Sequence, residues 1–358
     1  MKQAYIINAK ESRYYPICKE LERRGYNVNN LIFYEDYPTP YPIRLNIIFL
    51  QKILSAKELE YIDANEGQQF ASKRIEKYFS NISDISINNV SFAKDDLILC
   101  LNEFHLFESS FINNRFLSQN KALALISKHI YYRKLNIPFK KIYTREDYIN
   151  LNEDSFFLKP SICSFGKRGC FKITNDKEKK ELLIKNPEIF NGKRLFIAMP
   201  IVQFKTEIWV FTLFDSNGKP YLLWFLTENG NSTFSPFEKD LYIKIKKIND
   251  KLQIKSWMVT IQFLLDENGD LHFIDLNPRL PGDDDWYELV YKYLTGTRLS
   301  KTILDLILHD KKPIIYRTNK YVVEKENDKL DDKNIFKIWP YTDLYKKNPV
   351  LYFKKYKE

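Results

Sequence analysis

Two apolar segments, residues 257–265 and 271–276, flank the turn sequence Asp-Glu-Asn-Gly-Asp, and this arrangement constrains the fold more than any other feature. A short turn rich in Asp, Asn and Gly between apolar runs favours a β-hairpin. Because side chains alternate between the faces of a strand, Asp275 and Asn277 are predicted to share one face, and Gln262 can face the same space. Three oxygen-bearing side chains on one face suit Mg²⁺, a hard cation that also takes ligands from water and phosphate.

The residues after the hairpin add charge at the end of the second strand. The guanidinium of Arg279 would neutralise charge on a phosphoryl group during its transfer. A plainer alternative is an ordinary hairpin that ends in an Asn-Pro turn, with Asp275 solvated. The acids Asp283 and Asp285 also have two interpretations. They cap the helix that follows, or one of them holds a cationic amine in an acceptor pocket.

The spacing of apolar residues predicts an α/β module followed by mixed segments. A strand, a helix and a second strand are expected at residues 4–8, 13–24 and 28–35, with Gly25 as the helix C-cap. This β-α-β opening lacks a Gly-rich dinucleotide fingerprint. Further helices are expected at 118–135 (capped by Ser118), 176–186, 238–251 and 285–308, further strands at 96–100, 156–159, 194–199, 207–214 and 220–226, and a polar loop at 227–237.

The composition describes a chain of 358 residues that can bury a large core, since 44% of them are hydrophobic and 15% are aromatic. The formal net charge of +10 comes from basic residues spread along the whole chain, which argues against a nucleic-acid-binding patch. The four cysteines are too scattered for a disulfide framework or a zinc site. With neither a signal-peptide pattern nor an apolar run of about 18 residues, we expect a cytoplasmic protein without a membrane partner.

The hairpin resembles the signature of the ATP-grasp superfamily. In that family two hairpin strands carry an acid or Gln, then an acid, one residue, Asn-Pro-Arg and a nearby Gly. Here the sequence has Gln262, then 275–279 (DLNPR) and Gly282. Gln on the first strand is found in the carbamoyl-phosphate-synthetase branch. The resemblance implies that Gln262, Asp275 and Asn277 hold one or two Mg²⁺ ions, or Mn²⁺, although Asp275 is one methylene shorter than the usual Glu.

Upstream segments resemble the phosphate-contacting parts of the same family. Lys121, at the head of a helix, resembles the first nucleotide-contacting lysine, and Lys159 resembles the strand-end lysine that meets the α- or β-phosphate. Gly166 and Gly169 resemble the loop whose backbone closes over the phosphates. Taken alone, Lys121 would be interpreted as a solvated helix residue, and the glycine loop is not a Walker motif.

Residues 196–207 resemble the hinge that holds the adenine in this family. The resemblance assigns adenine contacts to backbone groups of Met199 and Ile201, and a ribose or polar-network contact to Glu207. The segment departs from the family pattern, because the usual acid-aromatic pair is missing and Pro200 has no donor N–H. The plainer interpretation of Glu207 is a surface strand residue.

The resemblance implies an α/β and α+β architecture, the ATP-grasp fold, in which two α+β subdomains grip ATP. An N-terminal Rossmann-like (pre-ATP-grasp) domain would cover residues 1–112, and the two subdomains would cover 113–195 and 196–310. A basic, aromatic-rich extension would follow at 311–358.

The implied activity is an ATP- and Mg²⁺-dependent ligation. ATP would phosphorylate a substrate carboxylate, and an amine would displace phosphate from the acylphosphate to form an amide, with ADP and phosphate released. The loops 160–170 and 227–237 would close to exclude water. The alternatives are a non-catalytic ATP-binding scaffold, a kinase or carboxylase of similar fold, and a nucleic-acid-binding protein. Which carboxylate and amine react stays open, as does a homodimer.

Overall fold

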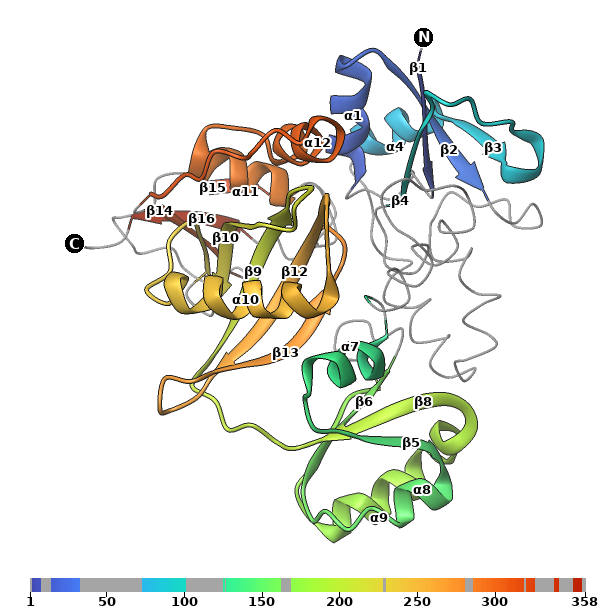
Figure 1. The fold of residues 1–358 in the computed structure, drawn as a ribbon, viewed down its shortest axis with the longest axis vertical. Coiled ribbons are helices and arrows are strands. Elements are labelled where there is room, and N and C mark those ends of the chain that lie inside the picture. Colours follow the sequence, from blue (N-terminus) through green and yellow to red (C-terminus); the bar gives the residue numbers. More distant parts are fainter. Residues whose placement is uncertain are drawn as a thin grey trace. The chain divides into compact units, whose positions relative to one another are not determined.

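A computed structural model describes residues 2–7, 14–32, 73–100, 125, 127–161, 169–227, 230–280, 286–318, 320–325, 338–340 and 350–355. These residues form three sheets, with strand orders β3-β2-β1-β4, β5-β8-β6-β7 and β13-β12-β9-β10-β11-β14-β16-β15 (Figure 1). Contacts divide the chain into two compact units. One contains the described residues up to Cys100 together with those from Phe204 onward, and the other contains the described residues between Leu125 and Gln203.

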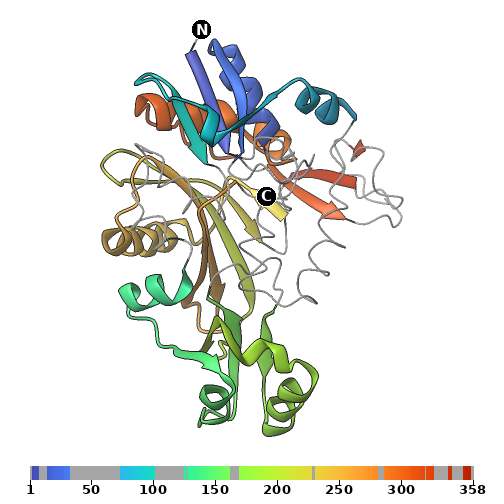
Figure 2. The same cartoon turned by 90° about the vertical axis from the view of Figure 1, so that its right-hand side faces the viewer.

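The N-terminal sheet is parallel throughout, and Figure 2 shows it beside the N-terminus. Ala4 to Ile7 form an uninterrupted buried apolar run, which is typical of a strand covered on both faces. Gly25 follows the first helix with a φ of +81°, a left-handed conformation that glycine adopts without steric cost. The predicted β-α-β opening is confirmed. The elements are β1 (Lys2–Ile7), α1 (Tyr15–Arg23), β2 (Tyr26–Ile32), α4 (Lys73–Ser80), β3 (Ser83–Ser86), η3 (Ile87–Asn89) and β4 (Leu97–Cys100).

The four-stranded sheet of the second unit is antiparallel and has a core of its own. In that core the ring of Tyr148 stacks on Phe190, with 4.4 Å between ring centroids. Thr144 and Asp147 form a capping box that starts the short helix after the first strand. The elements are α7 (Lys128–Leu135), β5 (Lys140–Thr144), α8 (Arg145–Ile149), β6 (Phe156–Pro160), β7 (Phe171–Ile173), α9 (Asp176–Lys185), η4 (Pro187–Phe190) and β8 (Asn191–Met199).

The eight-stranded sheet carries the predicted hairpin, and α10 lies across it (Figure 1). All nine residues of β12 are buried, so this strand is covered on both faces. The C-terminal extension adds strands β14, β16 and β15 to the sheet through β11. The elements are β9 (Thr206–Phe214), β10 (Pro220–Thr227), β11 (Gly230–Ser232), α10 (Glu238–Leu252), β12 (Trp257–Leu265), β13 (Leu271–Asn277), α11 (Trp286–Thr295), α12 (Leu299–His309), β14 (Lys320–Lys325), β15 (Ile338–Pro340) and β16 (Val350–Lys355).

Two helices that the spacing predicts as continuous are interrupted in the structure. The prediction of one helix over 118–135 is wrong at Ser127, which has an extended backbone and starts α7 by accepting a bond from the Tyr131 N–H; residues 118–124 lie outside the described residues. The prediction of one helix over 285–308 is wrong as well. Gly296, with a φ of +75°, ends α11, and the Glu288 carboxylate accepts the Ser300 N–H at the start of α12.

The predicted polar loop over 227–237 is also partly wrong, because three of its residues form strand β11. Asn231 and Ser232 are buried, and β11 lies between β10 and β14 in the sheet. Residues 230–232 are therefore part of the sheet, which contradicts the prediction that all of 227–237 acts as a closing loop. Among the described helices, none is long and apolar enough to cross a membrane.

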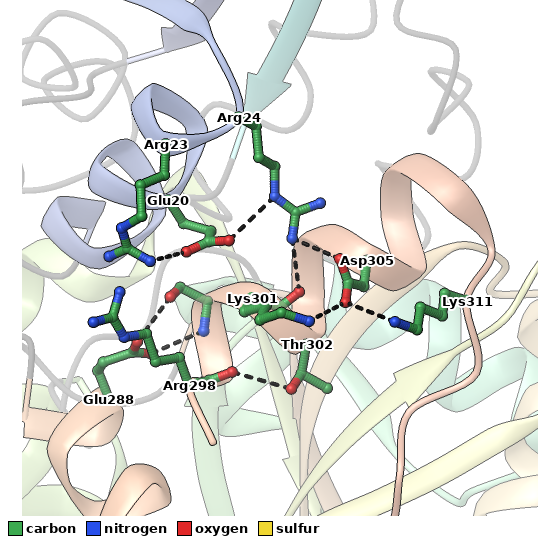
Figure 3. A network of polar contacts seen from close by, with 10 residues as sticks. Glu20, Arg23, Arg24, Glu288, Arg298, Lys301, Thr302, Asp305 and Lys311 are labelled. Carbon is green, nitrogen blue, oxygen red and sulfur yellow. Dashed lines mark hydrogen bonds and ion pairs between the residues drawn. The ribbon is translucent and has the colours of Figure 1, made fainter. Parts of the chain in front are cut away.

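A network of charged side chains fastens α12 to α1 (Figure 3). Arg24 donates to the Asp305 carboxylate at 2.6 Å, to the Lys301 carbonyl at 3.2 Å and to Glu20 at 3.3 Å. Asp305 also accepts from the Lys301 ammonium at 2.8 Å. Burial raises the pKa of Asp305, but the hydrogen bonds from Lys301 and Arg24 outweigh burial, so its pKa lies below the ordinary value. Since Arg24 and Asp305 are mostly buried, this contact contributes more than a surface ion pair.

We expect Asp305→Asn to lower the free energy of unfolding at pH 7 by about 2 kcal/mol, the range for hydrogen bonds to charged groups. A carboxyl with a depressed folded pKa stabilises the protein above its unfolded pKa of about 4, and this contribution disappears as the pH falls through the folded value. Urea unfolding at pH 7 and pH 3 should therefore show a smaller difference for the variant than for the wild type. Asp250→Asn, an exposed acid on α10, is the control, and equal losses in both variants would contradict the assignment.

Candidate metal and nucleotide site

A β-bulge in β13 decides which side chains share a face with Gln262. Next to the turn, Phe263 pairs with Phe273, but one residue further the register shifts and Gln262 pairs with Asp275. Ile274 is the extra residue. If the pairing continued without a bulge, Gln262 would oppose Ile274, and the Asp275 side chain would point to the opposite face.

With the bulge in place, paired side chains bring the predicted donors together. Directly opposed residues of antiparallel strands share a face, so Gln262 and Asp275 lie side by side. The next pair on that face is Thr260 with Asn277. The structure therefore places Gln262, Asp275 and Asn277 on one face of the sheet. Gln262 is buried, with 8% of its surface exposed, and the other two are half-buried.

Local hydrogen bonds fix both ends of the hairpin. At the turn, the Asp266 carboxylate accepts from the backbone N–H groups of Asn268 and Asp270 and lies 2.8 Å from His272 Nε2. The hydrogen bond to His272 is the largest cause of a lowered pKa at Asp266. At the other end, the Trp257 indole donates to the Pro278 carbonyl at 3.3 Å.

Arg279 and Asp275 each make a contact with their own backbone neighbour. The Arg279 guanidinium donates to the Leu280 carbonyl at 3.1 Å, and Asp275 Oδ1 accepts the Leu276 N–H at 2.9 Å. Both side chains are half-buried. The arginine therefore follows the donor strand closely, as the sequence predicts, while its role towards a phosphoryl group stays a prediction.

The donor set suits a magnesium ion that arrives with phosphate. It offers one carboxylate and two amide oxygens, and no group of three or more His, Cys, Asp or Glu side chains occurs elsewhere in the described ranges. Mg²⁺ is commonly held by one or two carboxylates together with waters and nucleotide phosphates, rather than by an all-protein cage. The residues present fit such an ion and do not fit a zinc site.

Two residues of this face were not predicted from the sequence. Thr260 is 4% exposed, and its hydroxyl has no hydrogen-bond partner among the described residues. Trp209 of β9 pairs with Gln262 and is half-buried. Thr260 lies two residues from Gln262, so counting along the strand would have found it. Trp209 required knowledge that β9 lies next to β12.

Glu207 lies on the same face as Trp209, two residues earlier in β9. Its Oε1 accepts a hydrogen bond from the Trp209 indole at 2.8 Å, and the side chain is half-buried. Glu207 is therefore more than a solvated strand residue. A contact to the ribose stays a prediction.

In the second unit, Lys159 lies on β6 and is 5% exposed. Its ammonium lies 5.1 Å from the centroid of the Tyr132 ring, a cation–π distance. Two residues later, the Ser161 carbonyl accepts a hydrogen bond from the Lys128 N–H. The Ser161 hydroxyl lies 2.6 Å from His129 Nδ1. Burial, and then the nearby Lys141 and Arg133, lowers the pKa of His129 below its ordinary value. These contacts tie the end of β6 to the start of α7.

The structure describes some of the remaining predicted nucleotide-binding residues and leaves others outside the described ranges. Gly169 has a φ of +67°, which glycine tolerates in a turn. Met199 ends β8 and is buried, and Ile201 is half-buried in the segment that follows. Four predicted site residues lie outside the described residues: Lys121, Gly166, Asp283 and Asp285.

Comparison with solved structures identifies the fold. An L-amino acid ligase from Bacillus licheniformis superimposes with a TM-score of 0.61 at 14% identity, covering 100% of this chain and 94% of that one. An N5-carboxyaminoimidazole synthetase from Staphylococcus aureus, complexed with ADP, gives 0.63 at 12% identity, covering 100% and 93%. A biotin carboxylase from Campylobacter jejuni gives 0.58 at 13% identity, covering 99% and 87%. No family model matches the sequence, and a search of curated proteins finds no match.

These structural neighbours are ATP-grasp enzymes, and the fold of this chain is the ATP-grasp fold. The predicted fold class is thereby confirmed. The similarity extends over the whole chain, although at these identities it speaks for the architecture alone.

Replacing Thr260 by valine tests whether its hydroxyl contributes to the stability of the fold. A buried hydroxyl without a partner costs free energy, so we expect Thr260→Val to leave the unfolding free energy unchanged or to raise it by about 1 kcal/mol. Thermal and urea unfolding measure this. Thr302→Val, which removes a hydroxyl that donates to the Arg298 carbonyl, is the matched control and should be destabilising. A larger loss at Thr260 than at Thr302 would show that the Thr260 hydroxyl stabilises the fold.

Proposed function

We propose that this protein is an ATP-dependent carboxylate–amine ligase that forms an amide bond through an acylphosphate and releases ADP and phosphate. The single observation that supports this most is the cross-strand group of Gln262, Asp275 and Asn277 on one face of the large sheet. The ATP-grasp fold adds support, since the neighbours include a structure named as an L-amino acid ligase and one complexed with ADP.

In the proposed reaction, Gln262, Asp275 and Asn277 would hold the metal through their oxygens, with Mg²⁺ preferred and Mn²⁺ as a substitute. The bound ion would neutralise charge on the β- and γ-phosphoryl groups. Arg279 would stabilise the charge of the phosphoryl group as it moves to the substrate carboxylate. Lys159 would contribute a positive charge for the phosphate tail, and its burial makes that charge stronger than at a wet surface.

The other assignments from the sequence belong to the same proposal. Met199, Ile201 and Glu207 would surround the adenosine part, and Lys121, Gly166 and Gly169 would contact phosphates. Asp283 or Asp285 would hold the amine. The division at residues 112, 195 and 310 is proposed as the functional division of the chain.

A carboxylase is the second candidate, favoured by the similarity to a biotin carboxylase and to carboxyaminoimidazole synthetases. The two candidates share the phosphorylation step and differ in its substrate, since bicarbonate would take the place of an organic carboxylate. An ADP-release screen separates them. Pooled carboxylates crossed with pooled amines form one arm, bicarbonate with the same amines forms the other, and mass spectrometry identifies the product. ATP binding without ADP release in both arms would favour a non-catalytic scaffold.

We expect Asp275→Ala and Asn277→Ala each to reduce substrate-dependent ADP release at least about a hundredfold, because removing groups that hold charge in the transition state costs about 3 kcal/mol or more. Asp270→Asn is the matched control, since it removes an exposed acid of the same hairpin away from the donor face. Full activity of either alanine variant, with the fold intact by circular dichroism, would remove the metal assignment.

A second expectation concerns Lys159. Lys159→Gln should weaken binding of Mg·ADP about tenfold or more, measured by calorimetry, because it removes a charge-assisted contact to phosphate. Lys172→Gln on the neighbouring strand β7, where the lysine is exposed, should leave the affinity unchanged. Equal affinities for both variants would exclude Lys159 from the phosphate site.

A further inference from the structure

Trp209 lies beside the proposed metal donors, in a row of side chains that crosses the large sheet. Asp275 pairs with Gln262, Gln262 pairs with Trp209, and Trp209 pairs with Leu226. Opposed residues share a face, so all four point to the same side. Neighbouring strands lie about 4.8 Å apart, which places the tryptophan one strand from the nearest donor.

The only polar atom of the Trp209 side chain is already occupied. Its indole N–H donates to Glu207 Oε1 at 2.8 Å, and a carboxylate is a stronger acceptor than a neutral group. The indole therefore has no donor left for a ligand. The part of the indole that remains for a ligand is its apolar ring face, and the hydrogen bond to Glu207 orients that ring.

No other aromatic ring of the described residues covers this face of the indole. Two neighbouring aromatic residues are stacked on other rings: Phe211 stacks on Trp224 at 5.1 Å, and Trp224 meets Tyr291 at 6.1 Å. Among the residues that the structure describes, neither a ring nor a cation lies against Trp209, whose side chain is half-buried. A tryptophan that is held by its nitrogen and left unstacked is suited to receive a planar partner.

We infer that Trp209 is a substrate-binding residue that selects a carboxylate carrying a planar, apolar ring, and that Glu207 is the positioning residue that orients the indole. The inference rests on the proposed function, which brings the substrate carboxylate to the metal donors. A ring stacked on Trp209 would lie about one strand spacing from Gln262. Only a short linker between the ring and the carboxylate fits that separation.

The test uses the full chain labelled with 5-fluorotryptophan and observed by fluorine NMR in the presence of Mg²⁺ and a non-hydrolysable ATP analogue. The chain has five tryptophans, so Trp209→Phe assigns the Trp209 signal and the other four serve as internal references. The probes are 3-phenylpropanoate and 4-methylpentanoate, which share the carboxylate and differ in carrying a ring or a branched alkyl group.

We expect 3-phenylpropanoate to shift the Trp209 signal in a saturable way, with an affinity about tenfold higher than that of 4-methylpentanoate, in line with the strength of aromatic stacking. Trp209→Leu should abolish this preference. Glu207→Gln, which keeps an acceptor oxygen, should preserve it, whereas Glu207→Ala should broaden the signal and reduce the preference. A purely structural role for Glu207 would lower stability in both variants without changing the preference.

Three outcomes would overturn the inference: equal responses to both probes, no response to either, or a shift caused by the nucleotide analogue alone, which would place a purine against the ring. The ADP-release screen separates this failure from failure of the proposed function. ADP release with aliphatic and aromatic carboxylates alike would keep the ligase proposal and remove the role of Trp209. A ring-selective NMR response without ADP release for any substrate pair would keep the ring-binding site and remove the ligase proposal.

Discussion

One extra residue in strand β13 determines whether the three proposed metal donors share a face of the sheet. Side chains alternate along a strand, so Asp275 and Asn277 share a face in any register. Whether Gln262 shares that face depends on the bulge at Ile274, because an unbulged hairpin would pair Gln262 with Ile274 and turn both donors away. The bulge can persist because β12 is buried on both faces and paired on both edges, which leaves the ladder little freedom to slip.

Local sequence patterns predicted the parts of the fold that depend on local physics. The hairpin turn, the β-α-β opening and the glycine at the end of α1 follow from residue preferences within a few positions. Ser127 interrupts one expected helix because its extended backbone starts a new turn by accepting from the Tyr131 N–H. Gly296 interrupts the other through its left-handed backbone, and the Ser300 N–H that follows donates to Glu288. The pairing of β11 with the C-terminal extension joins segments that are distant in the chain, and no local pattern specifies such a partner.

The site shows the same division between local and distant information. Residue type and spacing were enough to propose Asp275 and Asn277 as donors on one face, since carboxylate and amide oxygens are the ligands that a hard cation takes. Gln262 was proposed from its type, but it shares their face only because of the bulge at Ile274, which spacing does not reveal. Trp209 could not be selected in this way, because its importance comes from β9 lying next to β12 in the sheet. Its bond to Glu207 likewise joins residues two apart in a way that spacing alone does not reveal.

The chemistry of the donors itself argues for a nucleotide as the partner. One carboxylate and two neutral amides supply a single negative charge, too little to hold a divalent cation firmly without further anionic ligands. A bound nucleotide would provide them through its phosphates. Among the three proposed donors Asp275 is the one acid, and so this donor set suits a metal that arrives with nucleotide phosphates better than an independent metal centre.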